Sequence, residues 1–261
     1  YRYLAPEGRI LRFPHTGGVE LTAGSSTQVS LPTIEWGSVV KLFEYQLPGG
    51  LKTNIVFDLF NRVSCLMPGV ALPIRFYEGR DYRGHTLEST MVGLAARLDR
   101  DTRDNLEFLP TVHHLRPDGQ PITAKVYAFK RKEDGESASA KFRDREGIIF
   151  TVNGQAHGHL EKAFFKRSKV NMSYIAEDIL VLVDATELAG RSREDLFMNS
   201  RDRLRDGTLR RSIERDLESL VGDHELLRSL KQQRREQALS RKLQDDKILE
   251  KVLADIIRKS P

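Results

Sequence analysis

A nearly unbroken apolar run, ILVLVDATEL at residues 179–188, constrains this chain more than any other feature of its sequence. A strand with one face on water alternates apolar and polar residues, whereas a continuous apolar run is typical of a strand buried on both faces. We therefore predict a buried strand within this run, which needs apolar cover from the rest of the chain on both of its faces.

The composition permits such a core. The chain has 261 residues, of which 39% are hydrophobic and 30% charged, and this balance excludes wholesale disorder. No apolar run approaches the roughly 18 residues that a membrane helix needs. The one cysteine, Cys65, excludes an intramolecular disulfide framework and a four-cysteine zinc site, and a cytoplasmic protein fits this best. Cys65 lies on the apolar face of a predicted helix, so we interpret it as a core residue.

Strand and helix patterns follow one another in blocks and predict an α+β fold with a boundary near residues 110–120. The predicted segments are a hairpin of residues 1–4 and 9–13, a loop at 17–30, a strand at 36–47, a helix at 53–67, a strand at 71–79, an irregular stretch at 79–120, a strand at 122–130, a mobile loop at 132–147, a hairpin at 147–158, a helix at 159–167, and helices at 193–204, 208–221, 223–243 and 248–257. Thr208 and Asp223 are predicted N-caps.

No catalytic motif is complete: the sequence lacks a P-loop, a dinucleotide fingerprint, a zinc-protease motif and a nucleophile elbow. The pair His157 and His159 resembles part of a metal site, but no third or fourth ligand lies nearby in the sequence. We therefore predict no metal centre there.

Two segments contain residues that suit ligand binding. Gly37 and Ser38 open the predicted strand 36–47, where a small residue lets the backbone approach a ligand closely. Directly after the buried strand, residues 183–207 contain five arginines, and guanidinium forks suit phosphate because they bind it through two donors. These arginines either converge on one anion or pair with acidic residues beside them, and the sequence leaves both interpretations open. The five are Arg191, Arg193, Arg201, Arg203 and Arg205.

Together, these segments resemble the GHKL superfamily of Bergerat-fold ATPases, which includes gyrase B, MutL, the large ATP-driven heat-shock chaperone and the MORC proteins. WGSVVKLFEYQL resembles the late strand that a Gly-Thr pair opens in that superfamily, with Ser38 in place of Thr. FDLFNRVSCLMPGVALPIRFYEG resembles the closing helix and strand of a MORC-type ATPase domain. The resemblance implies that Gly37 and Ser38 contact the nucleotide.

The second half resembles the transducer, or middle, domain of that superfamily. GIIFTVNGQAHG is similar to a MORC strand and turn, and VDATELAGRSREDL is similar to the segment after the corresponding chaperone strand. In the superfamily, a basic residue in this segment reaches the γ-phosphate of ATP. The resemblance assigns that role to Arg193, with Arg191 and Arg201 as substitutes if the register differs.

The resemblance implies three parts: the C-terminal portion of a GHKL ATPase domain at residues 1–110, a β-α-β transducer domain at 111–221 and a helical arm at 222–261. The Glu/Asn box, the Asp-x-Gly-x-Gly loop and the Gly-rich lid of the superfamily are absent from this sequence. We therefore expect a fragment whose missing N-terminal ATPase segment carries them. ATP and Mg²⁺ would act in the intact protein, and this chain alone should be inactive.

The intact protein is then expected to be a homodimeric, ATP-driven clamp in DNA maintenance or phage defence. The net charge is +5, and residues 191–261 hold 18 Lys and Arg against 14 Asp and Glu. The alternative is a non-enzymatic module that binds nucleic acid or a protein partner. Its candidate phosphate contacts are basic residues on predicted helices. They are Lys166, Arg167, Lys169, Arg210, Arg211, Arg234 and Arg235.

Overall fold

A computed structural model describes residues 2–4, 9–11, 20–22, 28–30, 55–70, 74–77, 88–100, 104–132, 135–143, 145–200, 203–240 and 243. The chain separates into two compact units. The first contains Tyr1–Phe60 and Ile74–Met91, and the second contains Asn61–Pro73 and Val92–Pro261. None of the described helices is long and apolar enough to cross a membrane. The predicted division at residues 110 and 221 stays a prediction.

The described strands of the first unit form three antiparallel pairs. They are β1 (Arg2–Leu4) with β2 (Arg9–Leu11), β3 (Glu20–Thr22) with β4 (Gln28–Ser30), and β5 (Ile74–Tyr77) with β6 (Glu88–Met91). The first pair confirms the predicted hairpin, and β5 confirms the strand at 71–79. The prediction of a loop at 17–30 is wrong, because β3 and β4 pair there, with Leu21 opposite Val29 in the register. The sequence between these two strands contains the Gly/Ser cluster.

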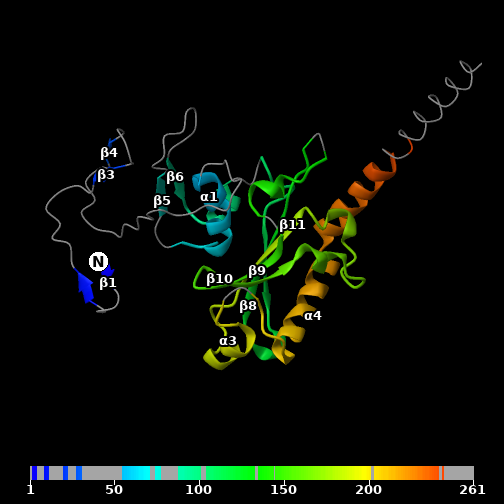
Figure 1. Ribbon diagram of the computed structural model, residues 1–261. Helices are drawn as coiled ribbons and strands as arrows, with labels where there is room; N and C mark the ends of the chain where they lie inside the picture. The colour runs from blue at the N-terminus through cyan, green and yellow to red at the C-terminus, as the bar shows by residue number, and fades with distance from the viewer. Residues whose placement is uncertain are drawn as a thin grey trace, which may run out of the picture. The chain divides into compact units, whose positions relative to one another are not determined.

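The second unit is built on one five-stranded sheet with the order β10-β9-β11-β8-β7 (Figure 1). The central strand β11 (Ile179–Asp184) runs parallel to β9 and antiparallel to β8. The other strands are β7 (Thr111–Leu115), β8 (Ile122–Ala128), β9 (Glu146–Val152) and β10 (Gln155–Glu161). The buried strand predicted from the apolar run is therefore confirmed, and the fold is α+β.

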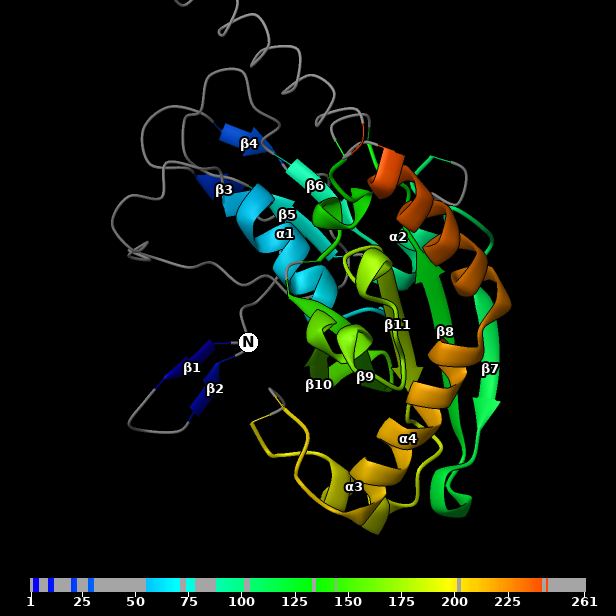
Figure 2. The same ribbon diagram turned by 90° about the vertical axis from the view of Figure 1, so that its right-hand side faces the viewer.

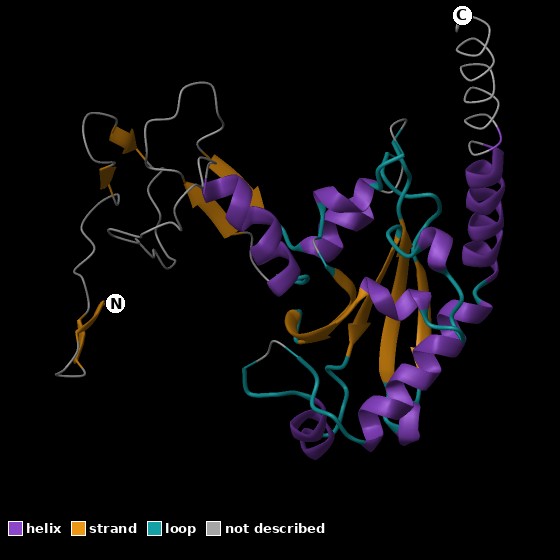
Figure 3. Ribbon diagram, turned by 45° about the vertical axis from the view of Figure 1, so that its right-hand side comes forward, coloured by secondary structure: helices purple, strands orange, loops and turns teal. Residues whose placement is uncertain are grey.

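Apolar clusters cover both faces of this sheet, and this explains why β11 does not alternate. On one face, Val181 and Val183 pack with residues of α4 (Thr208–Asp223) such as Ile213 and Leu217. On the other face, Leu180 and Leu182 pack in a cluster with Leu94 and Leu98 of α2 (Leu94–Arg100). Figure 3 shows α4 lying along the sheet. Both faces of β11 are thus removed from water, as its sequence requires.

The strand connections are tight. The β9–β10 hairpin turns at Asn153 and Gly154, with φ of 50° and 76°, as the Asn-Gly pair predicts. The chain then returns to β11 through short 3₁₀ turns rather than through the predicted helix at 159–167, because β10 continues to Glu161. The 3₁₀ turns within the described residues are η1 (Pro117–Gly119), η2 (Ala138–Lys141), η3 (Lys162–Lys166) and η4 (Ser173–Ile175).

The remaining helices form where the sequence patterns predict them, but several of their ends differ from the predicted ones. The predicted helix 53–67 is α1 (Ile55–Leu66). In place of the predicted helix 193–204, α3 (Gly190–Leu196) is followed by irregular chain. Gly207, rather than Thr208, is the N-cap of α4, and it has no side-chain cap. After α4, the chain forms a further helix over residues 225–240, as Figure 2 shows.

Two predictions of irregular chain are also wrong. The stretch 79–120 contains β6, α2 and β7. Within the predicted mobile loop 132–147, Ala138, Phe142 and Arg143 are buried. Phe142 stacks on Phe129, with ring centroids 5.4 Å apart. This one aromatic residue therefore anchors a segment whose sequence is mostly polar. The predicted strand at 36–47 and helix at 248–257 lie outside the described residues.

Candidate functional site

Polar side chains hold together the carboxyl end of β11 and the β9–β10 turn. The backbone N–H and hydroxyl of Thr186 both donate to Asp184 Oδ1, at 2.9 and 2.5 Å. The hydroxyl oxygen of Thr186 also accepts the N–H of Asn153, at 2.8 Å. Since Asn153 lies in the turn and Thr186 leads into α3, this chain of hydrogen bonds fixes the start of α3 relative to the sheet.

The short helix α3 is anchored at both ends. The N–H of Ala189, its N-cap residue, donates to Gln120 Oε1 at 3.3 Å. At the other end, Leu196 is fully buried and Phe197 packs on the ring of His157, with centroids 5.3 Å apart. The outward side chains of α3 therefore project from a fixed base.

Arg191 and Arg193 project from this helix without an acidic partner. Arg191 is exposed and Arg193 is half-buried. Among the described residues, no ion pair includes either guanidinium, although Glu194 and Asp195 follow on the same helix. Arg201, the third predicted candidate, lies outside the described residues. Arg191 and Arg193 thus carry no local carboxylate within the described residues, and the convergence of the five arginines on one anion stays a prediction.

The segment after α1 contacts the same end of the sheet. Gly69 N–H donates to Gly154 O at 2.9 Å, so the chain following α1 touches the β9–β10 turn. A Cβ on Gly154 would lie 2.4 Å from Gly69 O, and the positive φ of Gly154 also favours glycine. Contacts therefore run from Gly69 through the turn to Thr186 and on to α3.

Where the structure describes them, the other predicted site residues add no contact to this group of side chains. Gly37 and Ser38 lie outside the described residues, so their nucleotide contact stays a prediction. In the part of the chain that the structure describes, no group of three or more His, Cys, Asp or Glu residues could hold a metal ion. Cys65 is buried and its thiol donates to Phe142 O at 3.2 Å, as expected of a core residue.

Several predicted nucleic-acid contacts come together along η3 and α4, but they meet carboxylates there. Arg167 Nη1 lies 2.7 Å from Glu214 Oε2 and 2.9 Å from Glu218 Oε1. Arg210 Nε also contacts Glu214, at 2.7 Å, and Lys169 lies 3.9 Å from Glu218. We call these five residues the paired seam. Although burial opposes it, hydrogen bonds from Arg210 and Arg167 hold the pKa of Glu214 below its usual value.

Within the described residues, none of the remaining candidates forms an ion pair with the paired seam. Lys166 lies 3.7 Å from Glu177, and Arg211 lies 3.8 Å from Asp206. Arg234 is half-buried and pairs with Glu107, whereas its neighbour Arg235 is exposed. A phosphate would displace a carboxylate from most of these cations, and nucleic-acid binding stays a prediction from the sequence.

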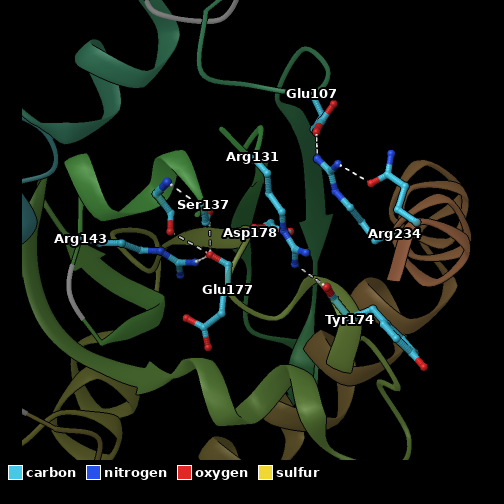
Figure 4. Close-up of polar contacts among 10 residues, drawn as sticks. Glu107, Arg131, Ser137, Arg143, Tyr174, Glu177, Asp178 and Arg234 are labelled. Carbon is cyan, nitrogen blue, oxygen red and sulfur yellow. Dashed lines mark hydrogen bonds and ion pairs between the residues drawn. The ribbon is translucent and has the colours of Figure 1, made fainter. Parts of the chain in front are cut away.

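A buried polar cluster lies at the N-terminal end of β11 (Figure 4), and the sequence patterns did not predict it. The Arg143 guanidinium, 3% exposed, donates to the carbonyl oxygens of Glu146 and Glu177. Burial lowers the pKa of Arg143 to about 10. Asp178 is fully buried, and Arg131 Nε donates to it at 2.9 Å. Burial raises the pKa of Asp178. Arg143 stands among Lys, Asp and Glu in the sequence, so no local signal marks it as buried.

The comparisons with known proteins assign no family. No protein-family model and no curated protein matches the sequence. Among solved structures, the B subunit of DNA gyrase from Myxococcus xanthus is similar at 14% identity and a TM-score of 0.32. The match covers 63% of this chain and 53% of that chain, so this chain spans about half of the gyrase subunit.

Proposed function

We propose that this chain is part of an ATP-driven GHKL-type clamp protein in which the segment after β11 supplies a basic side chain to the γ-phosphate of ATP. One observation carries the proposal: Arg191 and Arg193 project from the anchored helix α3 without an acidic partner among the described residues. The sequence resemblance of VDATELAGRSREDL to the transducer segment supports the same role.

The chemistry of these side chains fits a phosphate. A guanidinium offers two parallel donors to phosphate oxygens and keeps its charge at any physiological pH. Because neither arginine is in an ion pair in the described part of the chain, binding an anion would break no such pair. We assign the contact to Arg193 because its half-buried side chain is more confined than that of exposed Arg191.

ATP and Mg²⁺ would be held mainly by the nucleotide-binding part of the intact protein, where Gly37 and Ser38 would contribute. Bound there, they would supply the phosphoryl group and the charge that neutralises it. The residues of this chain would orient Arg193 and stabilise negative charge on the phosphate oxygens, as an arginine finger does.

Movement of the ATP-binding domain would reach α3 through the contacts at the end of the sheet. The resemblance places the segment after α1 in that domain, and Gly69 contacts the β9–β10 turn directly. From the turn, Asn153 and Thr186 continue to α3. In this proposal, closure of a homodimer clamp is coupled to nucleotide state through this path.

We place the intact protein in DNA maintenance or phage defence because its arm is rich in Arg and Lys. Residues 191–261 hold 18 Lys and Arg against 14 Asp and Glu. This placement rests on charge alone, and the experiment below does not depend on it.

The test compares ATP hydrolysis by the intact protein with that of Arg193→Ala. We expect kcat to fall by about 100-fold or more, since an arginine finger contributes on the order of 10³-fold or more. Arg215→Ala is the matched control, because Arg215 is an exposed arginine on α4. Its kcat should stay within about twofold.

A loss of less than about threefold for Arg193→Ala, under about 1 kcal/mol, would exclude Arg193 from catalysis. Arg191→Ala then tests the neighbouring register in the same assay. If neither variant is impaired, the proposed role of α3 is wrong.

A further inference from the structure

His224 forms the joint between α4 and the helix of residues 225–240. Its N–H donates to Val221 O at 3.4 Å and so ends α4. Its C=O accepts the N–H of Arg228 at 3.0 Å, and its ring Nδ1 faces the N–H of Leu227 at 3.4 Å. A single residue therefore caps the end of one helix and the start of the next.

The imidazole of His224 is enclosed by groups from other parts of the second unit. It is 8% exposed, and Phe108 stacks on it with ring centroids 5.9 Å apart. Its Nε2 lies 2.8 Å from Thr111 Oγ1, and the same hydroxyl oxygen lies 3.0 Å from His113 Nε2. Thr111 thus connects two imidazoles across the edge of the sheet.

The positions of the protons follow from these contacts. His224 Nδ1 accepts from Leu227, so the single proton of a neutral ring is on Nε2 and is donated to Thr111. The Thr111 hydroxyl is then free to donate its own proton to His113 Nε2 wherever that nitrogen is unprotonated. The contact with Leu227 requires an unprotonated Nδ1, so this arrangement exists only while the His224 ring is neutral.

A second proton on the His224 ring is incompatible with these hydrogen bonds. It would have to occupy Nδ1, where it would point at the N–H of Leu227, so that two donors would face each other. The helix of residues 225–240 would lose its N-terminal cap. Apart from this cap, the helix is held by Leu227 and Leu230 in the apolar core and by the ion pair of Arg234 with Glu107.

We propose that His224 is a pH-sensitive joint, and that protonation of its ring frees the helix of residues 225–240 to change its angle to α4. The ring can exchange protons with solvent, because it borders an open cavity of about 650 Å³ between β7 and α4. This proposal is independent of the role of α3.

Burial favours the neutral form of the His224 ring, whereas the negative charge of Glu225 favours the protonated form. Burial first, then the nearby His113, lowers the pKa of His224, and burial with His114 lowers the pKa of His113. The charged groups that line the same cavity are Asp216 and Asp223 on α4 and Glu225 on the following helix, and the side chain of Arg228 pairs with Asp223. Asp223 is already paired with Arg228, at 2.5 Å, and Glu107 with Arg234.

The test measures the distance from the sheet unit to the helix in the full chain at pH 7.5 and pH 5. Spin labels would be placed on Ser168→Cys and Leu239→Cys, both exposed positions, in a Cys65→Ala background. We expect one narrow distance distribution at pH 7.5 and a second population at pH 5. The His224 ring resonances should titrate with the same midpoint.

His224→Asn is the decisive variant, because Asn caps a helix without titrating. We expect it to keep the pH 7.5 distance at both pH values. His159→Asn is the control, since His159 lies on β10, at the opposite edge of the sheet from β7. It should retain the wild-type response.

An unchanged wild-type distance at pH 5 would overturn the proposal. So would a second population that persists in His224→Asn, because another group would then control the helix. Ring resonances that show Nδ1 protonated at pH 7.5 would also contradict it, and this measurement needs no variant.

Discussion

Two groups of arginines in the second unit have similar sequences around them and opposite surroundings in the structure. In the paired seam, Arg167 and Arg210 share Glu214, and Arg167 also contacts Glu218. On α3, Arg191 and Arg193 have no ion pair within the described part of the chain. Mixed-charge sequence therefore does not reveal which cations are available to a ligand. The distinction depends on which carboxylates the fold brings within reach.

After the loss expected for Arg193→Ala itself, the largest effect should come from loosening the base of α3. Thr186→Val removes the hydroxyl that bonds Asp184 and Asn153 but keeps the shape of the side chain. We expect about a tenfold loss in kcat of the intact ATPase, because Arg193 would no longer be held in place. Thr186→Ser keeps the hydroxyl and should retain activity. Equal activity of all three proteins would show that this chain of hydrogen bonds does not position Arg193.

The paired seam should affect stability instead. Arg167→Ala removes the nearest cation of Glu218 and leaves Glu214 with Arg210 alone, so we expect the free energy of unfolding to fall by about 1 kcal/mol. Urea denaturation of the full chain measures this. Arg211→Ala, which removes an exposed cation 3.8 Å from Asp206, should change it by less than about 0.5 kcal/mol. Equal effects would mean that the seam adds nothing beyond a surface pair.

Acid should abolish the difference between wild type and Arg167→Ala. The pKa of Glu214 is lower in the folded protein than its ordinary value of 4.5, so its stabilising contribution is present above about pH 4.5. That contribution is lost as the pH falls through the folded pKa. We expect the two denaturation midpoints to differ at pH 7 and to converge in acid, below the lowered pKa of Glu214. A constant difference would place the effect of Arg167 in packing on Phe164 rather than in charge.

The smallest effect concerns nucleic acid. Replacing Glu214 and Glu218 with Gln would free the cations of the paired seam, so we expect duplex-DNA affinity at low salt to rise by roughly threefold. The gain should disappear at moderate salt. Fluorescence anisotropy of a labelled duplex measures both. Strong, salt-independent binding by the unmodified chain would contradict the view that pairing suppresses this surface.

Much of the fold could be predicted because its signals are local. The apolar run at β11, the Asn153-Gly154 turn and the apolar face of α4 each appear within a short window and are confirmed. Arg143 and Phe142 could not be assigned in this way. They lie in a polar stretch, and their burial depends on Phe129 and Glu177, which are distant in the sequence.

The sequence by itself determined that β11 is buried on both faces and that basic residues follow it. Only the tertiary structure decided which of the basic residues are neutralised and that His224 joins two helices through Thr111. The physical reason is the separation along the chain between the residues that interact. Burial of an apolar strand is encoded in its own side chains, whereas ion pairs and shared hydrogen bonds depend on partners such as Glu214 for Arg167, 47 residues away.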